Sequence, residues 1–132
     1  MPGEKILVVE DNVMNMELFV DLLECDGYSV LRAKTGDEAL HIVGSELPDL
    51  ILMDMRLPDM DGVDLLKKLR EGPAGKVLFI VACTASLMDE QIKKVKGVGA
   101  DGFLGKPIEV DKFSSQIRKF LERAKKKGGG VK

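Results

Sequence analysis

The spacing of apolar residues along the chain predicts five short β-strands. Near-continuous apolar runs occupy residues 6–9, 50–53 and 77–82, and such runs are typical of strands buried on both faces of a parallel sheet. Residues 28–33 include more polar positions, as expected of an edge strand, and residues 101–104 form a fifth, weaker strand. The first, third and fourth strands should therefore be central, and the second and fifth should lie at the edges.

Five amphipathic helical patterns alternate with these strands. Gly27 ends the first pattern, a capping box from Thr35 to Glu38 opens the second, and Gly72-Pro73 ends the third. In chain order, the apolar stripes consist of Met14, Leu18, Phe19, Leu22 and Leu23; Ala39, Leu40 and Val43; Val63, Leu65, Leu66 and Leu69; Met88, Ile92 and Val95; and Val110, Phe113, Ile117, Phe120 and Leu121.

The strict alternation of strands and helices predicts an α/β fold. We expect a flavodoxin-like, doubly wound, five-stranded parallel sheet of strand order 2-1-3-4-5, with five helices covering its faces. In this winding the strand order reverses between the first and third strands. Ligands bind beyond the carboxyl ends of the strands at such a point, so the residues that follow them are the candidates for function.

Composition narrows the class of protein. The chain has 132 residues, which suits one domain. No apolar run approaches the roughly 18 residues of a membrane span, and the amino terminus lacks a secretory pattern. Two cysteines, Cys25 and Cys83, cannot make a disulfide framework, so we expect a cytoplasmic protein. A single histidine, His41, argues against a His-rich zinc site.

Charge is distributed unevenly along the chain. The net charge is −2, yet residues 112–132 carry eight basic residues and one acid. We expect a folded domain over residues 1–124 and a basic, glycine-rich, flexible tail over residues 125–132. Such a tail can touch nucleic acid or anionic lipid, but cations at a helix carboxyl terminus followed by glycine explain it better. Nucleic-acid and membrane partners are therefore not expected.

Polar side chains follow four of the predicted strands. Parallel strands end at one edge of a sheet, so these residues should converge although they are distant in sequence. Glu10 and Asp11 follow the first strand, Asp54 the third, Cys83 and Thr84 the fourth, and Lys106, followed by Pro107, the fifth.

Three converging carboxylates favour a bound cation, because their mutual repulsion is otherwise destabilising. Oxygen ligands suit Mg²⁺, and no cluster of His or Cys offers a site for zinc. Asp54 is then a candidate nucleophile toward phosphorus, with Mg²⁺, Lys106 and Thr84 available to neutralise an acyl phosphate. Individually, Asp11 and Thr84 also suit helix caps, and Lys106 suits a solvated loop. No glycine-rich phosphate loop is present, which disfavours nucleotide binding.

These residues resemble the receiver domain of bacterial two-component response regulators, the CheY-like family, over residues 5 to about 124. The matching features are Glu10-Asp11-Asn12, Asp54 with the loop Leu57-Pro58-Asp59-Met60-Asp61-Gly62, Thr84-Ala85, Phe103, and Lys106-Pro107, whose peptide bond is usually cis in the family. Asn15 and the Leu18-Phe19 and Leu22-Leu23 pattern resemble stand-alone receivers of the DivK type. Glu10 departs from the Asp found in many receivers.

The resemblance implies a role for each matching residue. Asp54 is the expected phosphoacceptor, residues 1–124 are the expected receiver domain, and Mn²⁺ is expected to substitute for Mg²⁺. The metal contacts implied are Glu10, Asp11, Asp54 and the backbone carbonyl of Arg56; the catalytic and switch residues are Thr84, Lys106 and Phe103; the residues that tune dephosphorylation are Arg56 and Ser86; and the loop residues are Pro58, Gly62 and Pro107.

The function implied is that of a single-domain response regulator in a phosphorelay. A histidine kinase or histidine phosphotransfer protein would donate the phosphoryl group, and an output partner would dock on the face formed by the fourth helix, fifth strand and fifth helix. Such a protein is not an enzyme, although it assists its own phosphorylation and dephosphorylation. A degenerate receiver that binds partners without phosphorylation is one alternative. A hydrolase of the haloacid-dehalogenase type is another, but it needs an Asp where Arg56 stands.

Overall fold

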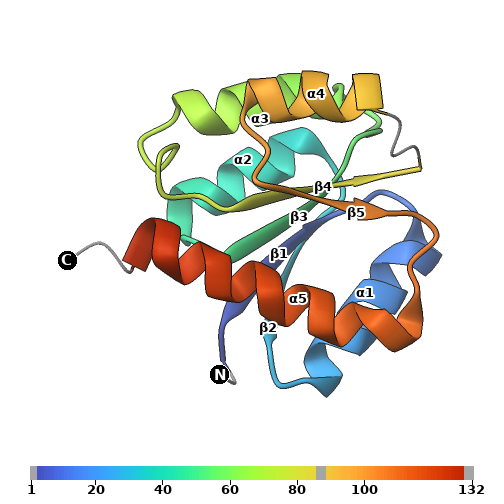
Figure 1. The fold of residues 1–132 in the computed structure, drawn as a ribbon. Helices are drawn as coiled ribbons and strands as arrows, with labels where there is room; N and C mark the ends of the chain where they lie inside the picture. The colour runs from blue at the N-terminus through green and yellow to red at the C-terminus, as the bar shows by residue number, and fades with distance from the viewer. Residues whose placement is uncertain (1–2, 86–88, 130–132) are drawn as a thin grey trace.

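The computed structural model describes residues 3–85 and 89–129, in which strands and helices alternate along the chain (Figure 1). This order confirms the predicted α/β organisation. The elements are β1 (Lys5–Val9), α1 (Val13–Cys25), β2 (Ser29–Ala33), α2 (Gly36–Ser45), β3 (Leu50–Asp54), α3 (Gly62–Glu71), β4 (Ile80–Thr84), α4 (Asp89–Val98), β5 (Gly102–Gly105), α5 (Val110–Ala124) and a π-helical turn, η1 (Lys125–Gly129).

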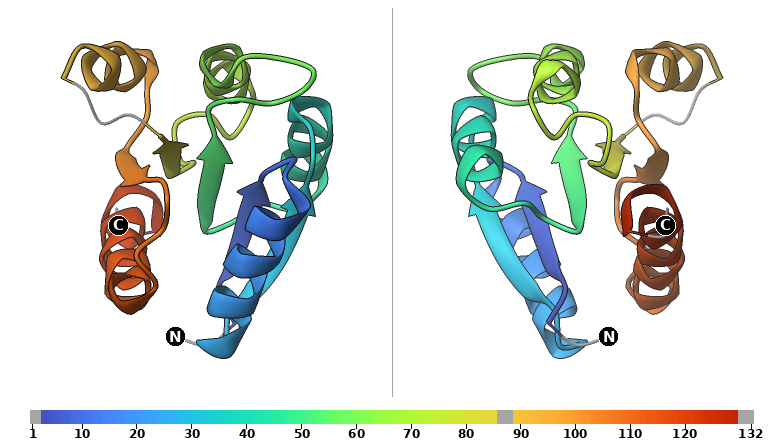
Figure 2. Two further views of the ribbon diagram at one scale, coloured as in Figure 1. Left: turned by 90° about the vertical axis from the view of Figure 1, so that its right-hand side faces the viewer. Right: turned by 90° about the vertical axis from the view of Figure 1, so that its left-hand side faces the viewer.

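The five strands form one parallel sheet of order β2-β1-β3-β4-β5, as predicted. Helices α1 and α5 cover one face, and α2, α3 and α4 cover the other (Figures 1 and 2). Asp54 is paired with Cys83, and Thr84 with Gly105, so the carboxyl ends of β3, β4 and β5 lie level with one another.

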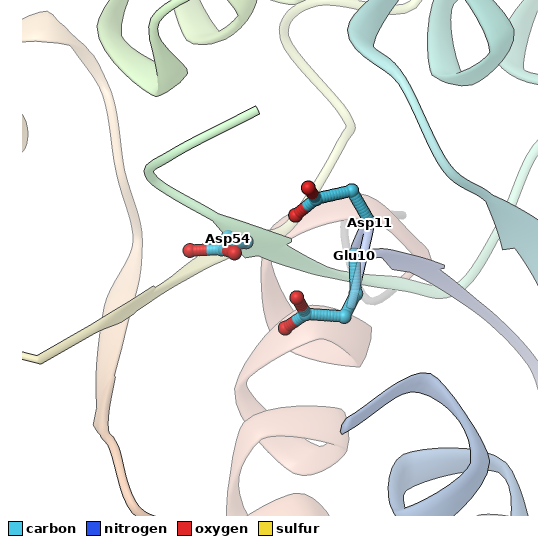
Figure 3. A group of neighbouring side chains, drawn as sticks. All are labelled: Glu10, Asp11 and Asp54. Atoms are coloured by element: carbon cyan, nitrogen blue, oxygen red, sulfur yellow. The ribbon is translucent and has the colours of Figure 1, made fainter. Parts of the chain in front are cut away.

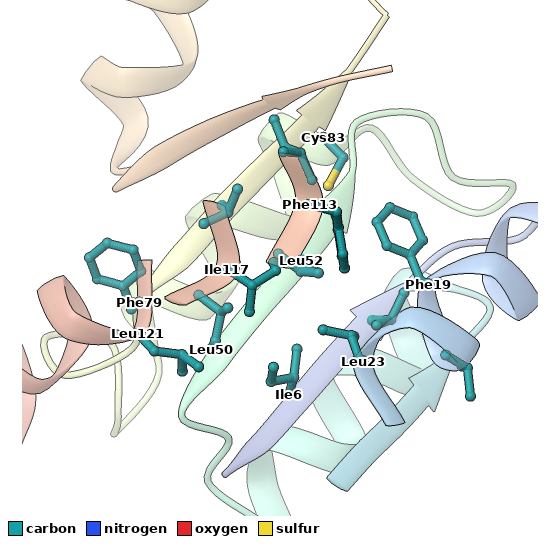
Figure 4. Close-up of a cluster of buried hydrophobic side chains, with 14 of the residues drawn as sticks. Ile6, Phe19, Leu23, Leu50, Leu52, Phe79, Cys83, Phe113, Ile117 and Leu121 are labelled. Atoms are coloured by element: carbon teal, nitrogen blue, oxygen red, sulfur yellow. The ribbon is translucent and has the colours of Figure 1, made fainter. Parts of the chain in front are cut away.

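Each face of the sheet has its own hydrophobic core. Under α1 and α5, Phe19 and Phe113 meet with ring centroids 5.9 Å apart, which joins two helices from opposite ends of the chain (Figure 4). On the other face, Leu65, Leu66 and Leu69 of α3 pack against the central strands. Each such buried side chain contributes roughly 1.5–3 kcal/mol, so the central strands are held from both sides.

The fourth strand begins later than predicted. The apolar run at residues 77–82 was expected to be the strand, but β4 spans Ile80–Thr84. Val77 is largely exposed, and the carbonyl of Leu78 accepts hydrogen bonds from Arg70 and Lys127 instead of from a neighbouring strand. Cys83 and Thr84 are consequently the last two residues of the strand, not residues that follow it.

The predicted stripe on the first helix is partly wrong. Met14 is 81% exposed and Leu18 is 36% exposed. The buried residues of α1 are Met16, Phe19, Val20 and Leu23, which follow the i, i+3, i+4, i+7 spacing of a single helical face. Phe19 and Leu23 of the predicted stripe are therefore confirmed, and Met16 and Val20 were missed. On α5, Val110 also lies outside the buried stripe, which consists of Phe113, Ile117 and Leu121.

The structure describes the first part of the predicted tail, as far as Gly129. Lys125–Gly129 continues α5 as the π-helical turn η1. Lys127 anchors this turn, because its Nζ donates to the Leu78 carbonyl at 3.1 Å and to Asp101 Oδ1 at 2.7 Å. The predicted division of the chain at residue 124 stays a prediction. None of the helices in the described part of the chain is long and apolar enough to cross a membrane.

Candidate functional site

Three carboxylates meet at the carboxyl ends of β1 and β3 (Figure 3). Glu10 extends the β1 ladder by donating its amide to the Ala33 carbonyl at 2.9 Å, and Asp54 is the last residue of β3. One oxygen from each of Glu10, Asp11 and Asp54 lies within 4.8 Å of the others. Glu10 is 1% exposed and Asp54 is 9% exposed, whereas Asp11 faces solvent.

Lys106, which follows the edge strand β5, supplies a positive charge to this cluster. Its Nζ lies 2.8 Å from Glu10 Oε1 and 3.3 Å from Asp54 Oδ2. Burial raises the pKa of Glu10 above its usual value, although Lys106 and the Asn12 amide oppose that shift. Burial would lower the pKa of Lys106, but the Glu10 hydrogen bond and the Asp54 charge raise it overall. Lys106 is therefore held as an ammonium.

Backbone amides orient two of the carboxylates. The Arg56 amide donates to Asp54 Oδ1 at 3.2 Å, and the Asn12 amide donates to Glu10 Oε2 at 3.2 Å. The cap of α1 is Asn12, whose side chain accepts from the Asn15 amide at 2.9 Å. The carboxylate of Asp11 is thus not the helix cap that its position also suited.

Thr84 and Lys106 lie side by side at the carboxyl ends of β4 and β5. The Lys106 amide donates to the Thr84 carbonyl at 2.8 Å, one step beyond the last β4–β5 pair. The Lys106–Pro107 peptide bond is cis, as the family resemblance implied. Thr84 also lines a pocket of about 200 Å³ beneath α4, with Ile92 and Phe103 in its wall. Phe103 is half-buried, so its ring is neither fully exposed nor enclosed.

Five of the predicted site residues line a cleft of about 680 Å³: Asp54, Arg56, Thr84, Lys106 and Pro107. Glu10, Asp11 and Pro58 line a second pocket of about 770 Å³, which shares Asp54, Arg56 and Lys106 with the first. Arg56 and Pro58 are both exposed, and Gly62 begins α3 where a Cβ would lie 2.6 Å from the Cα of Met55. Ser86 lies outside the described residues, as does Met88 of the predicted fourth stripe.

Cys83 pairs with Asp54 in the sheet, but its thiol is unreactive. It is 1% exposed, and burial raises the pKa of its thiol to about 12. A thiol in that state is a poor nucleophile at neutral pH. Cys83 therefore behaves as a small buried apolar residue.

The donor set fits a hard divalent cation. All three groups are oxygen donors, which suit Mg²⁺. Glu10 is almost fully buried, and with Asp11 and Asp54 it brings three carboxylates against one ammonium, that of Lys106. The cluster keeps two negative charges uncompensated, which a divalent cation would neutralise.

Sequence reasoning missed one residue of the loop after β3. Asp59 was quoted as part of the Leu57–Gly62 motif without a role, yet its carboxylate accepts from the amides of Gly36 at 2.8 Å and Asp37 at 3.0 Å. No pattern in the sequence signals that contact, because the partners are more than 20 residues apart and belong to different elements.

Known proteins match this chain over nearly its whole length. A sequence model of the response regulator receiver domain matches residues 6–118. The chain belongs to the response regulator receiver domain family. The polar-differentiation response regulator DivK of Brucella ovis is 36% identical over 118 residues, which is 89% of this chain and 96% of DivK.

Solved receiver structures share the fold. A putative response regulator from Chloroflexus aurantiacus is 32% identical, with a TM-score of 0.84 over 92% of this chain and 99% of its own. The receiver domain of the sensor histidine kinase PA1611 from Pseudomonas aeruginosa is 28% identical, with a TM-score of 0.82 over 91% and 98% of the two chains. That receiver carries a magnesium ion coordinated in its active-site cleft. Receivers of this family interact with histidine kinases and phosphotransfer proteins.

Proposed function

We propose that this receiver accepts a phosphoryl group on Asp54 from a phosphohistidine donor, with Mg²⁺ bound by Glu10, Asp11 and Asp54. The observation that carries the proposal is the convergence of these three carboxylates with the Lys106 ammonium at one edge of the sheet. The Arg56 carbonyl is the fourth protein contact that the family resemblance implies. The donor would be a histidine kinase or a histidine phosphotransfer protein.

The side chains divide the chemistry between them. A carboxylate oxygen of Asp54 attacks phosphorus, the bond from phosphorus to the donor nitrogen breaks, and the imidazole of the donor leaves with the electron pair. Lys106 stabilises the phosphoryl oxygens by charge, and the Thr84 hydroxyl donates to another of them. Mg²⁺, or Mn²⁺ in its place, supplies charge neutralisation when bound. The receiver turns over no separate substrate, so we do not class it as an enzyme.

Hydrolysis of the acyl phosphate is tuned at the rim of the cleft. Arg56 is exposed two residues beyond Asp54, and its long side chain can shield the phosphoryl group from water. We expect the Arg56→Asn variant to lose its phosphoryl group faster than the parent. Ser86 is the second tuning position that the family resemblance implies.

Output follows from the pocket between Thr84 and Phe103. Movement of Thr84 toward a phosphoryl group on Asp54 would open space that the half-buried Phe103 ring can enter. That change would alter the face formed by α4, β5 and α5, where the output partner docks. The Thr84→Ala variant should still accept phosphoryl, more slowly, yet lose phosphorylation-dependent partner binding.

Donor docking has a separate surface at the start of α1. Met14 and Leu18 are exposed apolar residues beside Asn15, which lines the cleft. We expect Asn15→Ala to slow transfer from a protein donor more than transfer from acetyl phosphate. Equal slowing by both donors would place Asn15 in the chemistry instead of in docking.

The alternative of a degenerate receiver is disfavoured because Asp54, Thr84 and Lys106 are all present and close together. One experiment decides between the two functions. The protein is incubated with acetyl phosphate and Mg²⁺, and its intact mass is measured. We expect a gain of roughly 80 Da, the mass of one phosphoryl group, that is abolished by chelation and by Asp54→Asn.

Asp64→Asn is the matched control for that experiment. It changes an exposed carboxylate in the first turn of α3, away from the cleft, and should leave labelling intact. No mass gain in the parent protein, or a gain that persists in Asp54→Asn, would contradict the proposal.

A further inference from the structure

We propose that Asp59 is a positioning residue for the metal site: its carboxylate latches the loop between β3 and α3 to the amino terminus of α2, and so fixes the Arg56 backbone beside Asp54. The inference rests on the proposed function, since it concerns the same site. It assigns to α2, a helix that contributes no side chain to the cleft lining, a part in Mg²⁺ affinity.

The latch is a two-point contact between segments distant in sequence. Asp59 Oδ1 accepts from the Gly36 amide at 2.8 Å, and Oδ2 accepts from the Asp37 amide at 3.0 Å. These amides open α2, where backbone donors have no partner within the helix and where a negative charge is favoured. Both oxygens are used, so the carboxylate is fixed in orientation as well as in place.

Met60 reinforces the contact from the next position in the loop. Gly36 is buried, and a Cβ built on it would lie 2.6 Å from the Sδ of Met60. The side chain of Met60 therefore rests directly on the α2 backbone. Two consecutive loop residues therefore contact the same turn of α2: Asp59 by hydrogen bonds and Met60 by packing.

The base of the loop transmits the position of its tip to Asp54. The Gly62 amide donates to the Met55 carbonyl at 3.0 Å, and Arg56 and Asp61 pair as an isolated antiparallel bridge. The loop is thus closed on itself between its tip and the sheet. The Arg56 amide in turn donates to Asp54 Oδ1 at 3.2 Å. A shift of Asp59 would move the backbone that orients the phosphoacceptor.

Helix α2 has a cap of its own, so the latch is not needed to begin the helix. Thr35 Oγ1 accepts from the Glu38 amide at 3.1 Å, and Glu38 Oε1 accepts from the Lys34 amide at 2.8 Å. The hydrogen bond from the Gly36 amide holds the pKa of Asp59 below its usual value, which keeps the latch charged. What Asp59 adds beyond the Thr35 cap is the position of the loop.

The test compares Asp59→Ala with Thr35→Ala, a matched control that removes a cap from the same helix without touching the loop. Mg²⁺ is titrated into each metal-free protein by calorimetry, and amide hydrogen exchange is followed over residues 55–61. We expect Asp59→Ala to raise the Kd for Mg²⁺ on the order of tenfold and to speed exchange in the loop. Thr35→Ala should lower the melting temperature but change neither quantity.

Asp59→Asn adds a graded check, because one side-chain oxygen remains as an acceptor. Its Kd for Mg²⁺ should lie between those of the parent and Asp59→Ala, and it stays informative if the alanine variant does not fold. Equal Kd values in the parent and both Asp59 variants would overturn the inference, as would an equal loss of affinity in Thr35→Ala. If the parent itself binds no Mg²⁺, the proposed function fails. The exchange data are a separate measurement, and they report whether Asp59 holds the loop.

Discussion

Lys106 donates from its Nζ to Glu10 Oε1 at 2.8 Å and so joins the ends of β5 and β1, two strands that are not neighbours in the sheet. Strands β3 and β4 lie between them, and Asp54 Oδ2 at the end of β3 lies 3.3 Å from the same Nζ. Lys106 therefore occupies the acidic cluster as an internal cation. It shares its carboxylate partners with any metal ion that binds there.

This arrangement predicts opposite effects of Lys106→Met on metal binding and on chemistry. Loss of the ammonium removes a repulsive charge, so Mg²⁺ should bind severalfold more tightly. The acyl phosphate loses one stabilising group, so labelling by acetyl phosphate should slow by about 100-fold. Calorimetry and intact-mass time courses measure the two effects. Lys112→Met, at an exposed lysine of α5, is the control that should change neither; weaker Mg²⁺ binding by Lys106→Met would refute the argument.

Glu10→Gln should stabilise the metal-free protein and weaken Mg²⁺ binding. The raised pKa of Glu10 means that its ionised form is less favourable in the folded protein than in the unfolded chain. A neutral amide of the same shape removes that cost but is a poorer ligand. We expect a higher melting temperature than the parent without metal and a smaller rise on adding Mg²⁺. A lower melting temperature without metal would show that the Lys106 contact outweighs the burial of charge.

The sequence predicted the sheet and the meeting of distant residues because both follow from periodicity and topology. Apolar runs placed β1, β3 and β4 at the centre, and parallel strands bring Asp54 and Lys106 to one edge whatever their separation in the chain. The start of β4 and the buried face of α1 were misjudged, because they depend on side chains from elsewhere. Arg70 donates a hydrogen bond to the Leu78 carbonyl, and Met16 rather than Met14 is buried.

Asp59 should give the latch a distinct pH dependence. Its pKa is lowered from the usual 3.8 by the Gly36 amide, so folding favours the ionised form. The stabilisation is present above pH 3.8 and is lost as the pH falls through the lower folded-state pKa. The difference in melting temperature between the parent and Asp59→Ala should therefore shrink in acid. Thr35 does not titrate, so the difference for Thr35→Ala should persist; parallel behaviour of the two variants would argue against a charged latch.

A second polar cluster lies at the opposite end of the sheet from the cleft, and no sequence motif announced it. Arg70 at the end of α3 donates to the carbonyls of Gly75, Leu78 and Gly99 and to Asp101 Oδ2 at 2.6 Å. Asp101 also accepts from the Ile80 amide at 2.9 Å. The cluster ties the ends of α3 and α4 to the start of β4. The sequence did not predict the cluster, because Arg70 and Asp101, each taken alone, are typical of charged surface residues.

Asp101→Ala should consequently be among the more destabilising changes outside the apolar core. It leaves Arg70, whose side chain is 17% exposed, without its carboxylate, and it removes one of the two acceptors that Lys127 contacts. Breaking a buried pair from one side costs about 3–5 kcal/mol, and partial exposure here lowers the expected loss to roughly 2–3 kcal/mol. Urea denaturation measures it. Glu109→Ala breaks the exposed pair with Lys112 and should cost less than about 0.5 kcal/mol. A loss for Asp101→Ala as small as that of Glu109→Ala would show that the Arg70 hydrogen bonds to backbone carbonyls hold the cluster without the carboxylate.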